Sequence, residues 1–195
     1  MYDDAITEFT YANTLNPSDP EPDLYISRTY ATVGDYAKAL QYAKEAVKDR
    51  PTDPSLRGNY GVMFYYNFFY TEAVEQLSLA TSGGETEDGF PIKGLPLAND
   101  LRVVEYYYTY GQSLARTNQC GKALKVAQDI QTNIHMDEIS MQTVSVGADK
   151  IIEICQQNLD NPVNTPTVIP AEGTAVEAPS ATEPATAVPV ETSAP

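Results

Sequence analysis

Small and apolar side chains recur along the chain at the spacing of an amphipathic helix. The segment GDYAKALQYAKEAVKDRPTDP, residues 34–54, has small residues at Ala39, Ala43 and Ala46. They lie three to four residues apart, so they share one face of a helix. Gly34 tolerates a left-handed turn and Asp35 caps a helix start, whereas Pro51 cannot continue a helix. The pattern predicts a helix between Asp35 and Pro51 that packs closely on its neighbour.

The same pattern repeats with a fixed period. Ala5, Ala39 and Ala73 lie 34 residues apart, and so do Ala12, Ala46 and Ala80. Ahead of the second and third alanine sets stand a large, a small and an aromatic residue: Ile26, Ser27 and Tyr30 before Ala39, and Tyr60, Gly61 and Phe64 before Ala73. Self-similarity at a period of this length is typical of stacked helical repeats.

This combination of large, small and aromatic residues, a Gly-Asp-Tyr turn, two alanines and a proline resembles the tetratricopeptide repeat (TPR). The resemblance covers roughly residues 1–132. It implies an all-α, right-handed superhelical solenoid of antiparallel helix pairs. The two helices of a pair approach where side chains are small, with Ala39 facing Ser27 and Ala73 facing Gly61.

A fourth copy follows a break. The segment YYYTYGQSLARTNQCGKALKVAQDI places Tyr110, Gly111, Leu114, Ala123 and Ala127 in phase, with about 16 extra residues before it. Glycines, prolines and acids in that insertion predict a loop. Two turns depart from the pattern, since Asn118 replaces the turn glycine and NFFY stands where Gly-Asp-Tyr is expected in the third copy.

These observations divide the chain into a solenoid, 1–159, and a tail. The solenoid comprises a half repeat at 1–17, repeats at about 20–51, 54–82 and 104–133, a loop at about 83–99 and a capping helix at 138–159. The residues expected to be buried in the capping helix are Ile139, Val146, Ile151, Ile152 and Ile154. Because the chain starts within a repeat, we expect it to be the C-terminal piece of a longer bacterial TPR protein.

The tail, 160–195, contains seven prolines and lacks aromatic and basic residues. It cannot bury enough apolar area to offset its conformational entropy, so we predict disorder. Its Thr/Pro-rich composition fits either a stalk of an envelope or secreted protein or a plain linker.

The net charge and the residue composition argue against several classes of function. The formal charge is −15, with 27 acidic and 12 basic residues. This balance disfavours binding to nucleic acid or an anionic membrane surface. Apolar runs are too short for a membrane span, and two cysteines with one histidine are too few for a usual structural zinc site. We found no catalytic motif; His135 fits a surface turn. The sequence therefore predicts a protein without catalytic residues, metal or cofactor.

The resemblance also implies where a partner would bind. In TPR proteins the first helix of each pair lines a concave groove, with exposed positions four residues apart. The matching residues here are Leu24, Arg28, Thr32, Val62, Tyr66, Tyr108, Gln112 and Arg116. This mixed surface suits an extended peptide or a helix, with Tyr66, Tyr108 and Arg116 as anchors. The Lys and Asn set with which the family binds a terminal carboxylate is missing. Tyr107 and Tyr110 fall at expected core positions.

Two functions remain open at this point. The first is a non-catalytic scaffold that binds a protein partner in the groove. The second is the C-terminal TPR region of a larger membrane or envelope enzyme, such as a glycosyltransferase, with its catalytic part upstream.

Cys120 and Cys155 fall at adjacent ends of antiparallel helices, so they form either a disulfide or two buried thiols. A disulfide would indicate an extracytoplasmic or envelope location, and free thiols would fit the cytoplasm.

Overall fold

The computed structural model describes residues 1–160, and the predicted disordered tail from residue 161 onward lies outside the described residues. The elements are α1 (Tyr2–Leu15), α2 (Pro20–Thr32), α3 (Tyr36–Asp49), α4 (Pro54–Tyr66), α5 (Tyr70–Ser82), β1 (Gly84–Glu85), β2 (Pro91–Ile92), α6 (Leu101–Arg116), α7 (Cys120–Asn133) and α8 (Glu138–Asp160). Within this part of the chain, no helix is both long and apolar enough to cross a bilayer.

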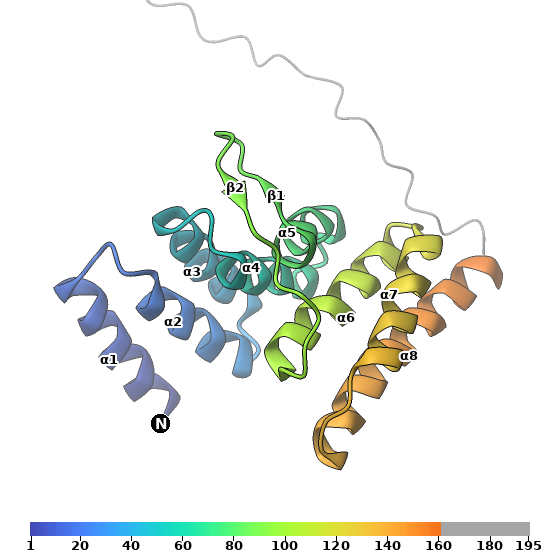
Figure 1. The fold of residues 1–195 in the computed structure, drawn as a ribbon. Helices are drawn as coiled ribbons and strands as arrows, with labels where there is room; N and C mark the ends of the chain where they lie inside the picture. The colour runs from blue at the N-terminus through green and yellow to red at the C-terminus, as the bar shows by residue number, and fades with distance from the viewer. Residues whose placement is uncertain (161–195) are drawn as a thin grey trace, which may run out of the picture.

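The helices pack in sequential antiparallel pairs (Figure 1), with α2 on α3, α4 on α5 and α6 on α7. The first helices of successive pairs also contact one another, from α2 through α4 and α6 to α8. They form an inner layer, and α3, α5 and α7 form an outer one. The all-α solenoid of helix pairs predicted from the sequence is confirmed.

The turn inside each pair has one geometry with different sequences. Gly34 has φ +84°, and the Asp35 side chain accepts a hydrogen bond from the Lys38 backbone N–H, which caps α3. Phe68 and Asn118 adopt the same left-handed region, with φ values of 66° and 60°. The turn therefore keeps its geometry where glycine is absent. Of the two residues that replace glycine, asparagine tolerates the left-handed region well and phenylalanine does not.

Small residues stand at the tightest crossings, as the repeat pattern requires. The Ala39, Ala73 and Ala123 side chains are fully buried. A Cβ added at Gly61 would lie 2.5 Å from Leu77 Cγ, closer than atoms can approach. The pair α4–α5 can therefore adopt this distance only with glycine at that position.

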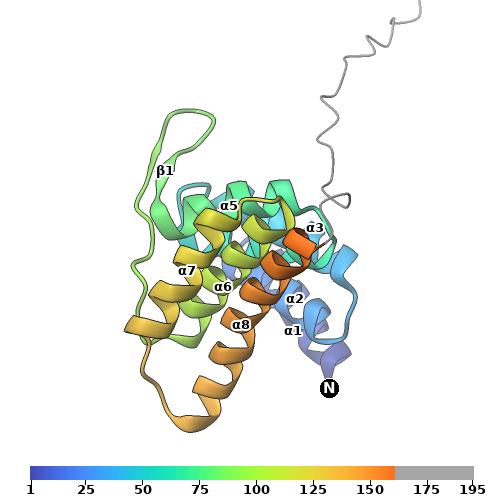
Figure 2. The same ribbon diagram turned by 90° about the vertical axis from the view of Figure 1, so that its right-hand side faces the viewer.

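The insertion between α5 and α6 is a small hairpin followed by a strap. In the hairpin Gly84 pairs with Ile92 and Glu85 with Pro91, and it projects from the solenoid (Figure 2). After it, the chain returns along the helices, and the Leu95 backbone N–H donates to the Ala80 carbonyl. The Tyr107 hydroxyl donates to the Leu95 carbonyl at 2.8 Å. These bonds connect the strap to both neighbouring pairs.

Helix α8 covers the exposed end of the α6–α7 pair. Its buried residues include Val144, Ala148, Ile151 and Ile154. The prediction that Ile139 and Val146 are buried is wrong, because both point to solvent on the opposite side of the helix. Ile152 is half-buried. Ile139 and Val146 lie seven residues apart on one helix face, and that face is turned away from the α6–α7 pair.

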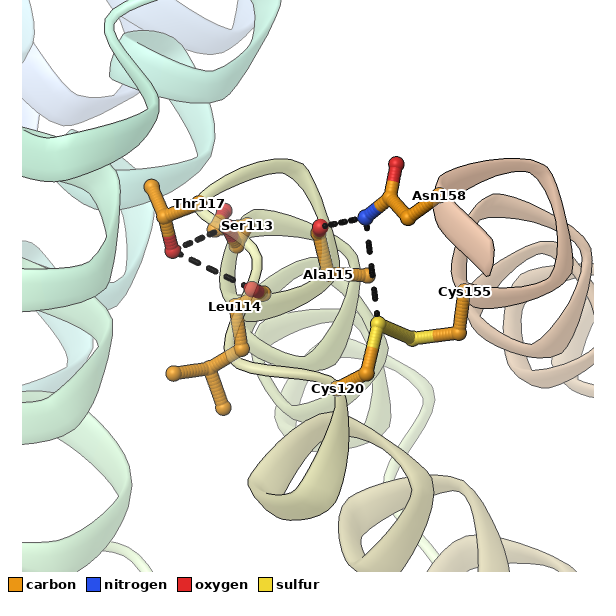
Figure 3. The surroundings of a disulfide bond; sticks show 7 residues. All are labelled: Ser113, Leu114, Ala115, Thr117, Cys120, Cys155 and Asn158. Atoms are coloured by element: carbon orange, nitrogen blue, oxygen red, sulfur yellow. Dashed lines mark hydrogen bonds between the residues drawn. A yellow bond between two sulfur atoms is a disulfide. The ribbon is translucent and has the colours of Figure 1, made fainter. Parts of the chain in front are cut away.

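A disulfide between Cys120 and Cys155 joins the start of α7 to the end of α8 (Figure 3). The two Cα atoms lie 5.6 Å apart. Beside it, the Asn158 side-chain amide donates to the Ala115 carbonyl at 2.8 Å. Since the bond connects residues 35 positions apart, it restricts α8 to its place against the last helix pair.

Candidate functional site

A groove runs along the inner layer, where α2, α4 and α6 meet. It consists of two adjoining hollows that share Arg102 and Glu105. One hollow is also lined by Arg28, Thr32, Tyr36 and Tyr66, and the other by Tyr108 and Thr143. We call these residues the inner groove. It is open to solvent and draws side chains from α2, α3, α4, α6 and α8.

One wall of the inner groove is a pair of stacked tyrosines. Tyr36 begins α3 and Tyr66 ends α4, and their rings lie 4.7 Å apart at 10° to one another. Burial raises the pKa of the Tyr66 hydroxyl, and the nearby Glu105 carboxylate adds to this. The phenol is therefore neutral at physiological pH and can donate a hydrogen bond.

The centre of the groove carries an ion pair on the first turns of α6. Arg102 pairs with Glu105, one turn apart on the same helix face. The Asp100 side chain caps α6 by accepting from the backbone N–H groups of Arg102 and Val103. The Arg102 side chain is about half exposed, so its guanidinium remains accessible to a second carboxylate.

Below the ion pair, Arg28 reaches from α2 toward Tyr106 of α6. An Arg28 terminal nitrogen donates to the Tyr106 hydroxyl at 3.4 Å, and that hydroxyl donates to the Ser55 carbonyl at 3.1 Å. Tyr106 is 1% exposed, and burial raises the pKa of its hydroxyl. This chain of hydrogen bonds connects α2, α4 and α6 under the groove.

Tyr108 forms the far end of the groove against α8. A Cβ added at Gly147 would lie 2.6 Å from the Tyr108 ring, so the ring lies directly on the α8 backbone. Burial raises the pKa of the Tyr108 hydroxyl strongly, and the Glu105 carboxylate raises it further. Tyr108 therefore stays neutral and offers a ring face together with a hydrogen-bond donor.

Four of the residues predicted from the sequence meet in the groove. Arg28, Thr32 and Tyr66 line one hollow, and Tyr108 lines the other. The four come from three helices, α2, α4 and α6.

Three others are buried, and their prediction as groove residues is wrong. Leu24 packs with Ala46 and Leu56, Val62 lies in the core with Ala39 and Leu77, and the Gln112 amide donates to the Gly147 carbonyl. A row of residues four apart turns by about 40° around the helix at each step. Such a row leaves the groove and passes under the neighbouring inner helix.

Arg116 is also not a groove residue. It ends α6, with its guanidinium carbon 5.9 Å from the centre of the Tyr70 ring in α5. It lines neither hollow of the groove. Its position at the opposite end of α6 from Arg102 explains the difference, because the groove crosses the first turns of that helix.

The sequence reasoning missed Tyr36, Arg102, Glu105 and the supporting Tyr106. Arg102 was outside the repeat expected to start at 104, whereas α6 begins at Leu101. The capping residue Asp100 ahead of LRVVE was the signal for that earlier start. Tyr107 and Tyr110, which were expected in the core, are half-buried, and Tyr106 occupies the core instead.

Comparison with known proteins identifies the fold. No protein-family model and no curated protein match the sequence. Among solved structures, "Crystal structure of MamA" is similar with a TM-score of 0.54 and 15% identity, over 83% of this chain and 89% of that chain. "MamA RS-1 ArsTM double mutant" is similar with a TM-score of 0.50 and 17% identity, over 82% and 88%. MamA is a TPR-repeat protein, and this chain accordingly has a TPR-like fold.

Proposed function

We propose that the chain is a non-catalytic scaffold that binds a peptide or a helix of a partner protein in the inner groove. The observation that carries the proposal is the row formed by the Tyr36–Tyr66 stack, Arg102 and Tyr108 on one accessible surface. Tyrosine and arginine dominate the binding energy of protein interfaces, because each combines a large contact area with a polar group.

The charges of the groove define the partner segment further. Although the whole chain carries a net charge of −15, Arg28 and Arg102 both line the groove. An acidic side chain of the partner would pair with Arg102 and compete with Glu105 for it. An apolar or aromatic side chain close to that acid would pack on Tyr36 and Tyr66. We infer that the partner segment combines both kinds of residue.

The groove chemistry supports binding rather than catalysis. Its titratable groups are two arginines, the carboxylates of Asp100 and Glu105, and tyrosines. Burial raises the pKa of the Tyr66 and Tyr108 hydroxyls. A tyrosine with a raised pKa stays protonated at neutral pH, so almost no phenolate is present to act as a nucleophile or base. His135, the single histidine of the sequence, lies in the turn before α8, where its backbone N–H donates to Asn99.

Selection of displayed peptides on the immobilised full-length chain tests the proposal. We expect the selected peptides to contain an acidic residue near an apolar one. Their affinity should fall at least about tenfold on the double change Tyr66→Ser with Tyr108→Ser, which corresponds to about 1.4 kcal/mol.

The matched control is Tyr42→Ser. Tyr42 is also a half-buried tyrosine, but it belongs to the outer helix α3, where it stacks on Tyr30. This change should leave the affinity within about twofold, which is below about 0.5 kcal/mol. Peptides that bind the double groove variant as tightly as the unchanged chain would contradict the proposal.

We propose further that the chain works in an oxidising, extracytoplasmic compartment, as in a cell envelope. The Cys120–Cys155 disulfide supports this location, because such bonds persist where thiols are not kept reduced. Thiol titration of the denatured protein, isolated from its native compartment under alkylating conditions, is the test. Two free thiols per chain would contradict the location.

A further inference from the structure

The turn between α4 and α5 breaks two rules that the turn between α2 and α3 obeys. In the latter, Gly34 takes the left-handed conformation and Asp35 caps α3. In the former, Phe68 takes the left-handed conformation with φ 66°, and Phe69 holds the capping position of α5. A bulky residue is strained in that region, and phenylalanine has no side-chain acceptor with which to cap a helix.

Both phenylalanines are exposed. Phe68 is 76% and Phe69 49% exposed to solvent. Phe68 touches Tyr70 edge-on at a centroid distance of 6.3 Å, and Tyr65 packs against Tyr70 at 5.6 Å. We call Tyr65, Phe68, Phe69 and Tyr70 the aromatic turn. This turn combines a strained backbone, a helix start without a side-chain cap and exposed apolar rings. Such a combination is typical of a binding surface.

The described part of the chain ends close to the aromatic turn. At the end of α8, Asn158 contacts Ala115 near the end of α6 (Figure 3). The neighbouring Arg116 guanidinium lies over Tyr70 at 5.9 Å. The path from the end of α8 to the aromatic turn thus passes two neighbouring helices, a distance of roughly 20 Å at the usual interaxial spacing.

The segment that follows Asp160 has the chemistry to cover this surface. Residues 162–170, PVNTPTVIP, contain three prolines, two valines and one isoleucine and carry no charge. Proline-rich segments bind aromatic surfaces at a low entropic cost, because proline restricts the chain before binding. Nine residues beyond Asp160 span up to roughly 30 Å, so Ile169 can reach the aromatic turn.

We propose that the aromatic turn is the docking surface for the chain's own segment Pro162–Pro170. Phe68 and Phe69 receive Ile169 and the flanking prolines, Pro166 and Pro170. This contact is separate from the inner groove and does not depend on the function proposed for that groove.

Methyl NMR of the full-length chain tests the contact. Ile169 is the single isoleucine after residue 160, and its methyl signals are assigned with Ile169→Val. We expect these signals to be shifted by aromatic ring currents relative to a synthetic peptide of residues 161–195, and to show cross-relaxation with phenylalanine ring protons. Identical Ile169 shifts in chain and peptide would overturn the proposal, and a partner of another kind would then be sought for the aromatic turn.

The diagnostic variant is Phe68→Gly with Phe69→Asp, which restores the Gly-Asp turn of the preceding pair. It should keep its helical circular dichroism and return the Ile169 signals to their peptide values. The control Tyr11→Ser with Leu15→Ser removes two exposed apolar side chains from α1 and should leave the Ile169 shifts unchanged. Ring-current shifts retained in the Phe variant would refute the assigned surface.

A second measurement does not depend on how the Phe variant folds. Ile169→Asp changes only the segment beyond the solenoid. The substitution should shift the NMR signals of the Phe68 and Phe69 ring protons toward the chemical shifts of solvent-exposed phenylalanine. These are two of the five phenylalanines in the sequence. Phenylalanine spectra that do not respond to Ile169→Asp would contradict the contact.

Discussion

The Tyr106 ring fills the space that Gly58 leaves open on α4. A Cβ added at Gly58 would lie 2.5 Å from two ring carbons of Tyr106, so the ring rests on the α4 backbone. From this position the Tyr106 hydroxyl bonds to both Arg28 and the Ser55 carbonyl. The approach of α6 to α4, and hence the shape of the inner groove, depends on this contact.

We predict that Gly58→Ala lowers the free energy of unfolding. Overpacking of the Tyr106 ring should cost about 1–3 kcal/mol, partly offset by about 1 kcal/mol from the better helix propensity of alanine. Chemical denaturation followed by circular dichroism measures the change. The control is Gly121→Ala in α7, where an added Cβ has open space, and that change should stabilise the protein by about 0.5–1 kcal/mol. Equal gains in both variants would contradict the close contact at Gly58.

The disulfide predicts a dependence of stability on redox state. Cutting a link across 35 residues should cost about 3–4 kcal/mol in the chain-entropy model. Urea unfolding of the oxidised chain and of Cys120→Ser with Cys155→Ser gives the difference. Hydrogen exchange should show the largest increase in α8. If the amides of α8 exchange at the same rate in the oxidised chain and in the double variant, the disulfide does not hold α8 in place.

Asp23 predicts an unusual dependence on pH. It lies buried at the start of α2 and accepts a hydrogen bond from the Asn13 amide at 2.9 Å. Burial raises the pKa of this carboxyl, and the nearby Asp49 and Glu45 carboxylates raise it further. Because the folded pKa exceeds the unfolded one, ionisation of Asp23 destabilises the fold as pH rises above about 3.9.

Asp23→Asn should therefore stabilise the protein at pH 7, and the gain should vanish below the pKa of the unfolded state. Urea midpoints at pH 7 and at about pH 3.5 measure the effect. The control Glu8→Gln, an exposed position on α1, should change neither midpoint appreciably. A gain that is larger at the acidic pH would contradict the assigned direction of the pKa shift.

The strap after the hairpin should loosen when Tyr107 loses its hydroxyl. That hydroxyl donates to the Leu95 carbonyl, and the Leu95 N–H in turn donates to Ala80. Tyr107→Phe should cost about 0.5–1.5 kcal/mol and accelerate exchange of the Leu95 amide. Tyr11→Phe, at an exposed tyrosine, is the control and should leave the exchange rates unchanged. Unaltered exchange at Leu95 in Tyr107→Phe would show that backbone contacts alone fix the strap.

The repeat architecture was predictable because it depends on local rules. Gly34, Asp35 and Pro51 each act on their own backbone, and the alanine period fixes which helix faces meet. The inner groove was only partly predictable. Leu24, Val62 and Gln112 are covered by neighbouring helices, and their burial depends on how far each inner helix is rotated against the next. The insertion before α6 also interrupts the repeat period, so the period does not fix how α6 is rotated against α4. At Phe68 the local rule fails instead. The repeat requires a left-handed residue in this turn, and Phe68 adopts that conformation although phenylalanine disfavours it.

Photo-crosslinking from the inner groove tests the central claim most directly. A photoreactive phenylalanine analogue such as p-benzoylphenylalanine would replace Tyr108 in the full-length chain, and a second protein would carry it at Tyr42 on the outer helix α3. The account predicts that a peptide selected on the chain becomes covalently attached through position 108 and not through position 42. It also predicts that Tyr66→Ser in the same chain reduces the yield. Attachment through position 42, or equal yields from both positions, would contradict a partner site in the inner groove.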